Sequence, residues 1–558
     1  MPDIPVPAIY FHPDQVEGQG RDLVGRRSAG ESFLKGFLRH AGGDTVRAVV
    51  ESANAATEFE AKVRALGDTR PVSVTELRGT SDFTAAGTVF FPAPGYQSAA
   101  WRRLRFGPGR CSLVGVTHTV STKRIVENLH GLMSQPVEPW DAIICTSRAV
   151  QSVVKRQFDL ETEYFRHRFG ATRMPLPQLP VIPLGIETAD FAPLPGARDR
   201  LRAARGVPKD AVVVLTMGRL SVVEKANPVP MMLALEQAAE QTGREVHLWM
   251  TGWASRAEEE ALHREAGAAL CRRVKFALLD GRDADIRRNI WAAADIFTLP
   301  ADSIQETFGL VPVEAMAAGL PVVMPDWDGF RDTVPHGEAG IRVATRMAPP
   351  GTGAALARRF ADDTDSYLQY LTLVQSQIQI DVPAYAAAFA ALIGNDELRR
   401  RMGANALAHA RRAYDWAAVI PHYLALAQEL AAIRARGAVS TPPLAPGAIS
   451  PLEVDPFDLY RDYPTRLVGP DTILHPGVPV DAERLALLGR LSGQVFYRRQ
   501  QATPELLLRV AAVVQAKGAI SARDLAAAGG ASVETVMAAA LQLAKFDILR
   551  LAPEPPRP

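Results

Sequence analysis

Two glutamates separated by seven residues, Glu306 and Glu314, follow a short apolar run that predicts a β-strand. Pro312 is tolerated only in the first turn of a helix, and Gly319 suits a helix end, so we predict a helix that begins near Gly309. Glu306 then lies on the loop before the helix, and Glu314 lies inside it. Because the free amides of a helix N-terminus attract phosphate, this segment could bind a phosphorylated ligand. The alternative is an acidic pair that only complements the helix dipole.

Two cations follow another predicted strand. Gly218 and Arg219 end the run Val212–Met217, and Lys225 comes shortly after them. An arginine can grip phosphate oxygens in a fork and a lysine adds a point charge, so the two could stabilise a departing diphosphate. The alternative is a solvated surface pair, which is the commoner outcome for an isolated Arg and Lys.

Short β-branched runs alternate with amphipathic helical stretches over the first 190 residues. The strands that we predict there are Ala8–His12, Val46–Glu51, Thr88–Phe91, Ser112–Val116, Ala142–Thr146 and Leu179–Leu184. The helices that we predict between them include Ser28–Arg39, Ala55–Leu66 and Thr122–Met133. Apolar strands alternating with helices favour a parallel sheet covered on both faces, which is a Rossmann-like domain.

The same pattern restarts after a Pro- and Arg-rich stretch at Thr188–Asp210. The strands that we predict in this second α/β domain are Val212–Met217, Val246–Met250, Val274–Leu278, Ile296–Leu299 and Val322–Met324. Two such domains in series leave a cleft between them, and α/β sheets bind ligands at the carboxyl ends of their strands. The predicted fold class is therefore α/β, with two Rossmann-like domains facing a cleft.

The chain changes character beyond the second domain. It becomes helical after about Thr352, and the five prolines of Gly437–Pro456 are typical of a linker. We predict Rossmann-like domains at 1–190 and 191–414, a long helix at 415–436 that packs back toward the first domain, a Pro-rich linker and irregular segment at 437–499, and a winged-helix-like module at 500–558.

Composition favours an ordinary globular protein. Lys plus Arg is 62 and Asp plus Glu is 61, so a net charge of +1 supplies no global field toward nucleic acid or anionic membranes. The three cysteines form no Cys-x-x-Cys pair, which excludes a cysteine-rich zinc site. We see neither a signal peptide nor an apolar run of the roughly 20 residues needed to span a bilayer, so we expect a cytoplasmic protein. Peripheral membrane contact stays open.

Together these features resemble the retaining glycosyltransferases of the glycosyltransferase family 4 type, which includes glycogen synthase and bacterial mannosyltransferases. The fold of that family is GT-B, two Rossmann-like domains facing a cleft. The resemblance implies that the domain at 1–190 binds the acceptor and that the domain at 191–414 binds the nucleotide-sugar donor. The resemblance covers about residues 1–435. It is carried by Glu306 with Glu314, Phe308-Gly309-Leu310, Gly319-Leu-Pro321-Val-Val, Gly218-Arg219 with Lys225, Val181-Ile-Pro-Leu-Gly185-Ile-Glu187 and Asp141-Ala-Ile-Ile-Cys-Thr-Ser147.

The resemblance implies a role for each site residue. Glu314 would accept the ribose hydroxyls of a nucleotide, and Glu306 would lie beside the transferring sugar. His118 would face that sugar from the first domain. The residues that would hold the diphosphate and the rest of the donor are Arg219, Lys225, Gly218, Thr307, Phe308, Gly309, Leu310 and, in the glycine-bearing loop Asp14–Gly30, Gly25.

The implied function is retaining transfer of a sugar from a nucleotide diphosphate sugar, UDP- or GDP-linked, to a glycan, lipid or small-molecule acceptor. We expect no cofactor and no metal. The alternatives are a nucleotide-sugar epimerase on the same fold and a catalytically inactive scaffold with a regulatory tail.

Two departures from the family pattern concern the site. The interval from Arg219 to Lys225 is one residue longer than usual, which weakens the assignment of the lysine. After Pro325 the chain reads Asp326-Trp-Asp328-Gly, where many relatives have a Gly-Gly pair, and this change could alter which sugar fits. We interpret Asp326, Asp328 and the similar pair in Asp283-Ala-Asp285 as surface or supporting carboxylates rather than metal ligands.

The last residues predict three helices and a strand, at Glu505–Ala516, Ala522–Ala528, Val533–Lys545 and Asp547–Leu551. The order resembles a winged helix. However, the helix that would read DNA contains Lys545 as its one cation and has Glu534 at its start, whereas such helices are usually far more basic. We therefore expect no nucleic-acid partner, and a module for protein docking or self-association instead.

Overall fold

The computed structural model describes residues 6–13, 25–444, 448, 450–492 and 502–552. The chain divides into two compact units, Met1–Pro443 and Leu444–Pro558. None of the helices in the described parts of the chain combines the length and the apolar character that a membrane crossing needs.

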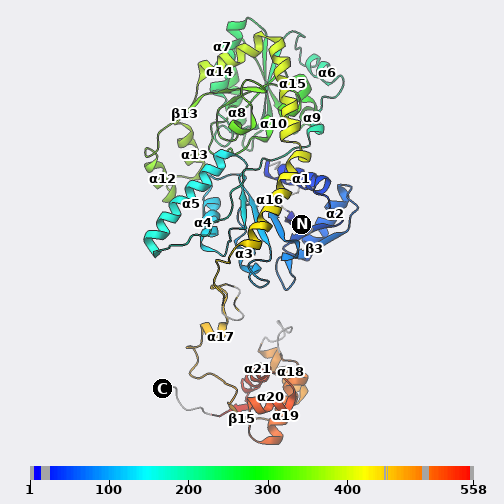
Figure 1. The fold of residues 1–558 in the computed structure, drawn as a ribbon, viewed down its shortest axis with the longest axis vertical. Coiled ribbons are helices and arrows are strands. Elements are labelled where there is room, and N and C mark those ends of the chain that lie inside the picture. Colours follow the sequence, from blue (N-terminus) through cyan, green and yellow to red (C-terminus); the bar gives the residue numbers. More distant parts are fainter. Residues whose placement is uncertain (1–5, 14–24, 445–447, 449, 493–501, 553–558) are drawn as a thin grey trace. The chain divides into compact units, whose positions relative to one another are not determined.

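The first domain is built on a six-stranded parallel sheet with the order β3-β2-β1-β4-β5-β6 (Figure 1). Its strands are β1 (Ala8–Phe11), β2 (Val46–Val50), β3 (Val72–Glu76), β4 (Thr88–Phe91), β5 (Ser112–Val116) and β6 (Ala142–Ile144). The helices between them are α1 (Gly25–His40), α2 (Ala53–Ala65), α3 (Gln97–Arg103), α4 (Lys123–Ser134) and α5 (Arg148–Phe169). Val50, Val89 and Val114 are fully buried, as expected for strands covered on both faces.

The second domain repeats this topology, with the order β12-β11-β10-β7-β8-β9 in a second six-stranded parallel sheet. Its strands are β7 (Val212–Arg219), β8 (Val246–Trp253), β9 (Lys275–Asp280), β10 (Ile296–Thr298), β11 (Val322–Pro325) and β12 (Gly340–Val343). The helices are α6 (Ala197–Ala203), α7 (Val229–Thr242), α8 (Ala257–Leu270), α9 (Ala284–Ala293), α10 (Leu310–Ala317), α11 (Phe330–Thr333), α12 (Ala354–Ala361), α13 (Tyr367–Gln375), α14 (Val382–Gly394) and α15 (Asp396–Ala413). β13 (Thr345–Met347) and β14 (Ile378–Ile380) form a separate antiparallel pair, with α12 and α13 between them in the chain. The predicted pair of Rossmann-like domains is confirmed.

Each sheet reverses its strand order at one position. In the first sheet the reversal lies between β1 and β4, and in the second it lies between β7 and β10. Crossover connections leave on opposite sides of a sheet at such a position, so a crevice opens at the carboxyl ends of the two strands and receives ligands. Both sheets therefore have a defined position for a ligand.

Helix α16 (Trp416–Arg436) follows the second domain but packs on the first. Its Tyr423 lies 5.3 Å from the ring centroid of Phe33 in α1 and 5.4 Å from that of Phe90 in β4. Figure 1 shows the yellow α16 running alongside the first domain. Gly185 lies against Trp416, and a Cβ atom at that position would come within 2.4 Å of its indole ring. The glycine of the 181–187 motif therefore allows the returning helix to approach closely.

Several predicted elements differ in the structure. Leu179–Leu184 is no strand, since Pro180 and Pro183 donate no backbone hydrogen bond, and its Val181 makes one isolated bridge to Cys145, directly after β6. Helix α1 begins at Gly25, so the second half of the predicted loop Asp14–Gly30 is helical. The edge strands β3 and β12 were not predicted.

The stretch between the two domains is also more ordered than its sequence suggests. Its arginines form internal contacts: Arg198 and Arg202 of α6 both pair with Asp295, at 2.6 Å and 3.0 Å. Asp295 in turn accepts a hydrogen bond from the backbone N–H of Val213. This cluster anchors α6 to the second sheet.

The C-terminal unit has its own core. It contains α17 (Pro456–Leu459), β15 (Ile473–Pro476), α18 (Ala482–Leu491), α19 (Pro504–Lys517), β16 (Ile520–Ser521), α20 (Ala522–Gly529), α21 (Val533–Ala544) and β17 (Leu549–Leu551). The strands form an antiparallel sheet with the order β16-β15-β17. The predicted irregular segment 437–499 is wrong in part, because Leu474 of β15 and Leu485 of α18 are buried in this core. The helices α19, α20 and α21 lie at the predicted positions, while the winged-helix assignment stays a prediction.

Candidate active site

The segment around the two glutamates is a loop and helix held in one conformation by glycines. Helix α10 begins at Leu310, and Gly309 caps it with φ at 84°. A Cβ atom at Gly309 would lie 2.3 Å from the ring of Phe330, so a side chain is excluded there on steric as well as backbone grounds. Gly319, with φ at 82°, follows the last turn. Glu306 thus lies before the helix and Glu314 within it, as predicted.

Lys225 reaches this loop. Its Nζ atom lies 2.6 Å from Oε2 of Glu306, and the two side chains are 24% and 10% exposed. The backbone N–H of Lys225 donates to the carbonyl of Ser221, so a turn absorbs the longer interval after Arg219. The extra residue therefore does not remove the lysine from the site.

The two glutamates have opposite electrostatic environments. Burial alone would raise the pKa of Glu306, but the charge and hydrogen bond of Lys225, with backbone N–H groups of Thr307 and Phe308, hold that pKa below its usual value. Burial raises the pKa of Glu314 to about 7, and the charge of Lys225 offsets part of the rise. Glu306 is thus stabilised as a carboxylate, whereas Glu314 changes protonation state near neutral pH.

Arg219 ends strand β7 and pairs with Glu224 at 3.0 Å. Arg219, Gly218 and Lys225 line a small pocket of about 310 Å³ together with Leu299 and Pro300, which follow β10. The pocket therefore lies at the reversal of the second sheet, between β7 and β10. Two cations at the carboxyl ends of these strands suit an anionic ligand.

The loop before α10 contacts the first domain directly. The hydroxyl of Thr307 donates to the backbone carbonyl of His118 at 2.9 Å. The hydroxyl of Ser147 donates to the carbonyl of Thr307 at 2.8 Å while it also caps helix α5. His118, which follows β5, therefore contacts Thr307, the residue after Glu306 in the sequence. The 141–147 motif contributes Ser147 to this junction.

Asp328 lies near the charge of Glu306. Its backbone is left-handed with φ at 44°, and its Oδ2 atom is buried without a hydrogen-bond partner among the described residues. Burial, with the nearby charge of Glu306, raises the pKa of Asp328 to about 8. The loop is fixed by Trp327, whose indole N–H donates to the carbonyl of Ser303. Of the two alternatives, a surface or a supporting carboxylate, the burial of Asp328 therefore leaves the supporting one.

The other Asp-x-Asp residues have structural contacts. Asp283 caps α9, Asp285 pairs with Arg200 at 2.7 Å, and Asp326 pairs with Arg342 at 3.1 Å. Within the described ranges, no group of three or more His, Cys, Asp or Glu side chains is arranged to hold a metal ion. The expectation of metal independence stays a prediction.

Residues 14–24 of the predicted glycine loop lie outside the described residues. Gly25, assigned to the donor by resemblance, is the first residue of α1. Gly30, in the second turn of that helix, lines a larger pocket in the first domain. This pocket was not predicted, because its residues come from four strands and two helices and look like ordinary core positions in the sequence.

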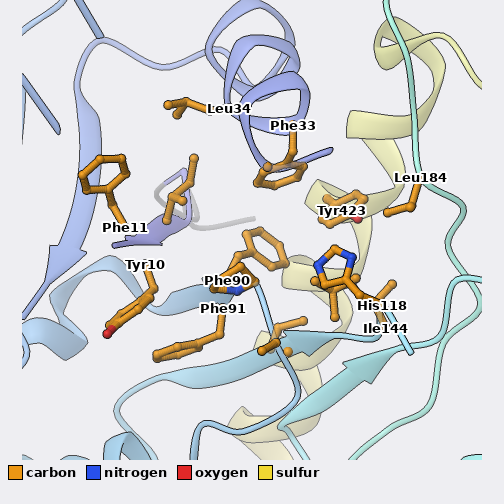
Figure 2. A pocket seen from close by; sticks show the side chains of 17 residues that line it. Tyr10, Phe11, Phe33, Leu34, Phe90, Phe91, His118, Ile144, Leu184 and Tyr423 are labelled. Atoms are coloured by element: carbon orange, nitrogen blue, oxygen red, sulfur yellow. The ribbon is translucent and has the colours of Figure 1, made fainter. Parts of the chain in front are cut away.

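Figure 2 shows this first-domain pocket, where the rings of Phe33, Phe90, Tyr423 and His118 surround one space. It encloses about 880 Å³, part of it open to solvent. Its residues include the ends of β1 and β4, so it lies at the reversal of the first sheet. The molecule thus has one pocket at each reversal, and the loop of Glu306 lies where the first domain meets the second.

Comparison with known proteins finds a family that matches the second domain. Residues 211–362 match the profile of the family described as glycosyl transferases group 1. The protein contains a group 1 glycosyltransferase domain. That domain holds Arg219, Lys225, Glu306 and Glu314, and the predicted resemblance is confirmed at this level.

Several proteins that are similar to this chain are named as glycosyltransferases. A D-inositol 3-phosphate glycosyltransferase of Kineococcus radiotolerans is 28% identical over 313 residues, which cover 55% of this chain and 64% of that protein. A phosphatidyl-myo-inositol mannosyltransferase of Mycobacterium leprae is 28% identical over 326 residues, covering 58% and 69%. The match thus spans less than two thirds of the first of these relatives. Among solved structures, Anabaena HepE with UDP and glucose is 17% identical, with a TM-score of 0.46 over 77% of this chain and all of that one (100%).

Proposed function

We propose that this protein transfers a sugar from a nucleotide diphosphate sugar to an acceptor hydroxyl with retention of anomeric configuration and without a metal ion. The observation that carries the proposal is the ion pair between Lys225 and Glu306 at the start of α10. It places a cation, a carboxylate and the amides of a helix N-terminus at one point of the cleft. A diphosphate and a hydroxyl-bearing sugar need these partners together.

Each group has a part in this chemistry. Arg219, Lys225 and the N-terminus of α10 bind the diphosphate and stabilise its growing negative charge. Glu306 accepts hydrogen bonds from the sugar, and Glu314 accepts them from the ribose. His118 faces the sugar from the first domain. Because these groups are fixed before the reaction, little reorganisation is required as the charge develops.

The proposed step balances without an added acid or base. The acceptor oxygen bonds to the anomeric carbon on the face from which the diphosphate departs. The bond from that carbon to the diphosphate oxygen breaks, and its electron pair goes to the diphosphate. The acceptor proton passes to the departing phosphate oxygen. Attack and departure on one face preserve the configuration of the sugar.

The contacts between the two domains support a site from which water is excluded. Thr307 binds the backbone at His118, Ser147 binds the backbone at Thr307, and Ser121 lies 2.7 Å from the hydroxyl of Tyr367 across the domains. Excluding water from the donor suppresses its hydrolysis and strengthens the electrostatic contacts with the diphosphate. Transfer to an acceptor is then favoured over loss to solvent.

A donor screen tests the proposal. A nucleotide sugar that binds should raise the melting temperature by mass action, so UDP-, GDP- and ADP-linked sugars are compared by thermal shift. The donor that binds is then incubated with acceptor candidates, and the anomeric configuration of the product is read by NMR. Inversion would contradict the mechanism. Conversion of the donor sugar to its epimer with no acceptor present would favour the epimerase alternative.

A further inference from the structure

The pocket of the first domain has the position of a substrate site. It lies at the reversal between β1 and β4, where α/β sheets receive ligands. The group 1 domain at 211–362 supplies none of its lining residues, so the family match does not account for it.

The walls of this pocket are apolar to an unusual degree. Aromatic rings come from β1, α1, β4 and α16, and the remaining wall is mostly aliphatic. Three of the lining residues have polar side-chain atoms: Tyr10, His118 and Tyr423. The hydroxyl of Tyr10 already donates to Glu51 at 2.7 Å, and its ring stacks on Phe91 at 5.0 Å. The pocket therefore offers a ligand an apolar surface to pack against and few groups with which to form hydrogen bonds.

The pocket shares His118 with the proposed transfer site. His118 is one of the lining side chains in Figure 2, and its backbone carbonyl accepts the hydrogen bond from Thr307. Glu306, which we assign to the donor sugar, is the neighbour of Thr307 in sequence. A molecule seated in the pocket would therefore have one end beside the sugar and the rest enclosed by rings.

We propose that this pocket binds the body of the acceptor, and that the acceptor is an alcohol with an apolar body, either a fused ring or a hydrocarbon chain. The inference rests on the proposed function, which supplies the need for a hydroxyl beside the donor. A polyhydroxylated acceptor is disfavoured, because hydroxyl groups buried against these walls would lose their hydrogen bonds to water without replacement. An apolar body would gain from the same burial.

Direct binding tests the pocket apart from the transfer reaction. The full chain is titrated by calorimetry, without donor, with 2-naphthol as the ring probe, 1-octanol as the chain probe and myo-inositol as the polar control. We expect saturable binding of one apolar probe per chain and none of myo-inositol. The probe that binds more tightly shows whether the apolar body is a fused ring or a hydrocarbon chain.

A filled pocket provides the matched variant. Ala93 is half-buried in the pocket wall, and Ala93→Phe should fill its mouth and weaken apolar binding at least tenfold. Ala85→Phe is the control, since Ala85 is exposed in the 3-10 turn Phe83–Ala86 of the same domain and does not line the pocket. If Ala93→Phe fails to fold, Leu184→Asn tests the same wall by introducing an amide at a half-buried position.

The outcomes separate this inference from the proposed function. Apolar binding that is lost in Ala93→Phe and kept in Ala85→Phe supports the pocket, even if no sugar is transferred. Absence of apolar binding, or equal binding in both variants, overturns the inference, while transfer to a polar acceptor would still uphold the transferase. With the donor found by the screen, apolar alcohols should be glycosylated and Ala93→Phe should raise their KM while leaving the affinity for nucleotide diphosphate unchanged.

Discussion

Lys225 and Glu306 lie 81 residues apart in the chain and form an ion pair of 2.6 Å. One partner lies in the loop after β7 and the other lies in the loop after β10, the two strands at which the sheet order reverses. The pair holds a cation where a diphosphate would lie and an ionised carboxylate where a sugar would lie. Binding of a donor would supply a new anion for Lys225 and sugar hydroxyls for Glu306.

Removing the lysine should therefore lower turnover and move its pH dependence. Lys225→Met should reduce kcat by about a hundredfold to a thousandfold, the usual cost of losing one donor to a developing anion. Glu306 would also lose the charge that holds its pKa down, so the acid limb of the rate profile should move to higher pH. Initial rates from pH 5 to 9 measure both effects. Lys209→Met, at an exposed site of the same domain, is the control, and an unshifted acid limb would contradict the coupling.

The two glutamates should differ in what they contribute. Contact with a spectator ribose is felt equally before and during reaction, whereas contact with the reacting sugar is felt in the transition state. Glu314→Ala should weaken binding of the bare nucleotide diphosphate, and Glu306→Ala should leave that binding nearly intact and lower turnover. Calorimetry decides this, and an equal loss of binding in both variants would refute the division.

Glu314 also makes nucleotide binding depend on pH. Its pKa of about 7 means that the ribose-accepting carboxylate must lose a proton below that pH, so affinity should fall by up to about tenfold per pH unit from pH 7 to 5. The diphosphate itself also gains a proton near pH 6. Glu314→Gln isolates the glutamate, because it keeps the size of the side chain and removes its titration. A pH dependence that is as steep in Glu314→Gln as in the unaltered protein would assign the effect to the ligand.

Local sequence was enough to predict much of the second domain's site. Pro312 and Gly319 bound a helix by backbone chemistry alone, and α10 runs from Leu310 to Ala317 as these residues require. The reach of Lys225 was uncertain from spacing, because the turn at Ser221 that brings it back depends on a tertiary path.

Other features could not be read from the chain in sequence order. Phe33, Phe90 and Tyr423 look like core residues separately, and only the return of α16 to the first domain brings them around one pocket. For Asp328 the sequence left two alternatives open, a surface or a supporting carboxylate. Its burial follows from the close packing of Gly329 on the backbone of Phe308, which sequence does not reveal.

Asp328 should lower stability as the pH rises. Its pKa is raised from about 4 to about 8 on folding, so the folded protein favours the protonated acid and loses that advantage between these values. Asp328→Asn should therefore flatten the fall in melting temperature between pH 5 and 9. Asp363→Asn is the control, since Asp363 shares the left-handed backbone, with φ at 52°, but is exposed. Equal pH dependence in the Asp328→Asn variant and the unaltered protein would disprove the burial effect.

The same residue should influence the donor sugar. Asp328→Gly removes a carboxyl group near Glu306 and suits the left-handed backbone, which favours glycine. We expect the order of kcat/KM among nucleotide sugars to change, while affinity for the bare nucleotide diphosphate stays within about twofold. Competition assays with mixed donors measure the order. An unchanged order would show that Asp328 does not face the sugar.

The C-terminal unit should not bind duplex DNA. In α21 the described side chains include Glu534 near the N-terminus, and Lys545 follows at the C-terminal cap. Such a helix offers few contacts to phosphate, on which DNA affinity and its salt dependence rest. The full chain and a chain ending at Pro443 should behave alike in a duplex mobility assay at 50 and 200 mM salt. A salt-sensitive shift seen with the full chain alone would assign nucleic-acid binding to the tail.

Transfer should proceed without a divalent metal. A departing nucleotide diphosphate carries about two to three negative charges near neutral pH, since a terminal phosphate loses its second proton near pH 6. Metal-dependent transferases offset this charge with a cation held by carboxylates. Here Arg219 and Lys225 line the pocket between β7 and β10, and α10 begins at the end of the loop that holds Glu306. Fixed cations and amides in a closed cleft can perform the same electrostatic task.

Excess EDTA should therefore leave the initial rate of the unaltered protein nearly unchanged. Arg219→Ala should lower turnover about a hundredfold or more, because it removes one of the two fixed cations, and added magnesium should not restore the rate. Rates with EDTA, with magnesium and with manganese are compared for both proteins. Loss of the wild-type rate in EDTA with recovery on adding metal would defeat the prediction. Asp326 and Asp328, which follow β11 and of which Asp328 lies near Glu306, would then become the candidate ligands, and Asp326→Asn would be expected to weaken the response to metal.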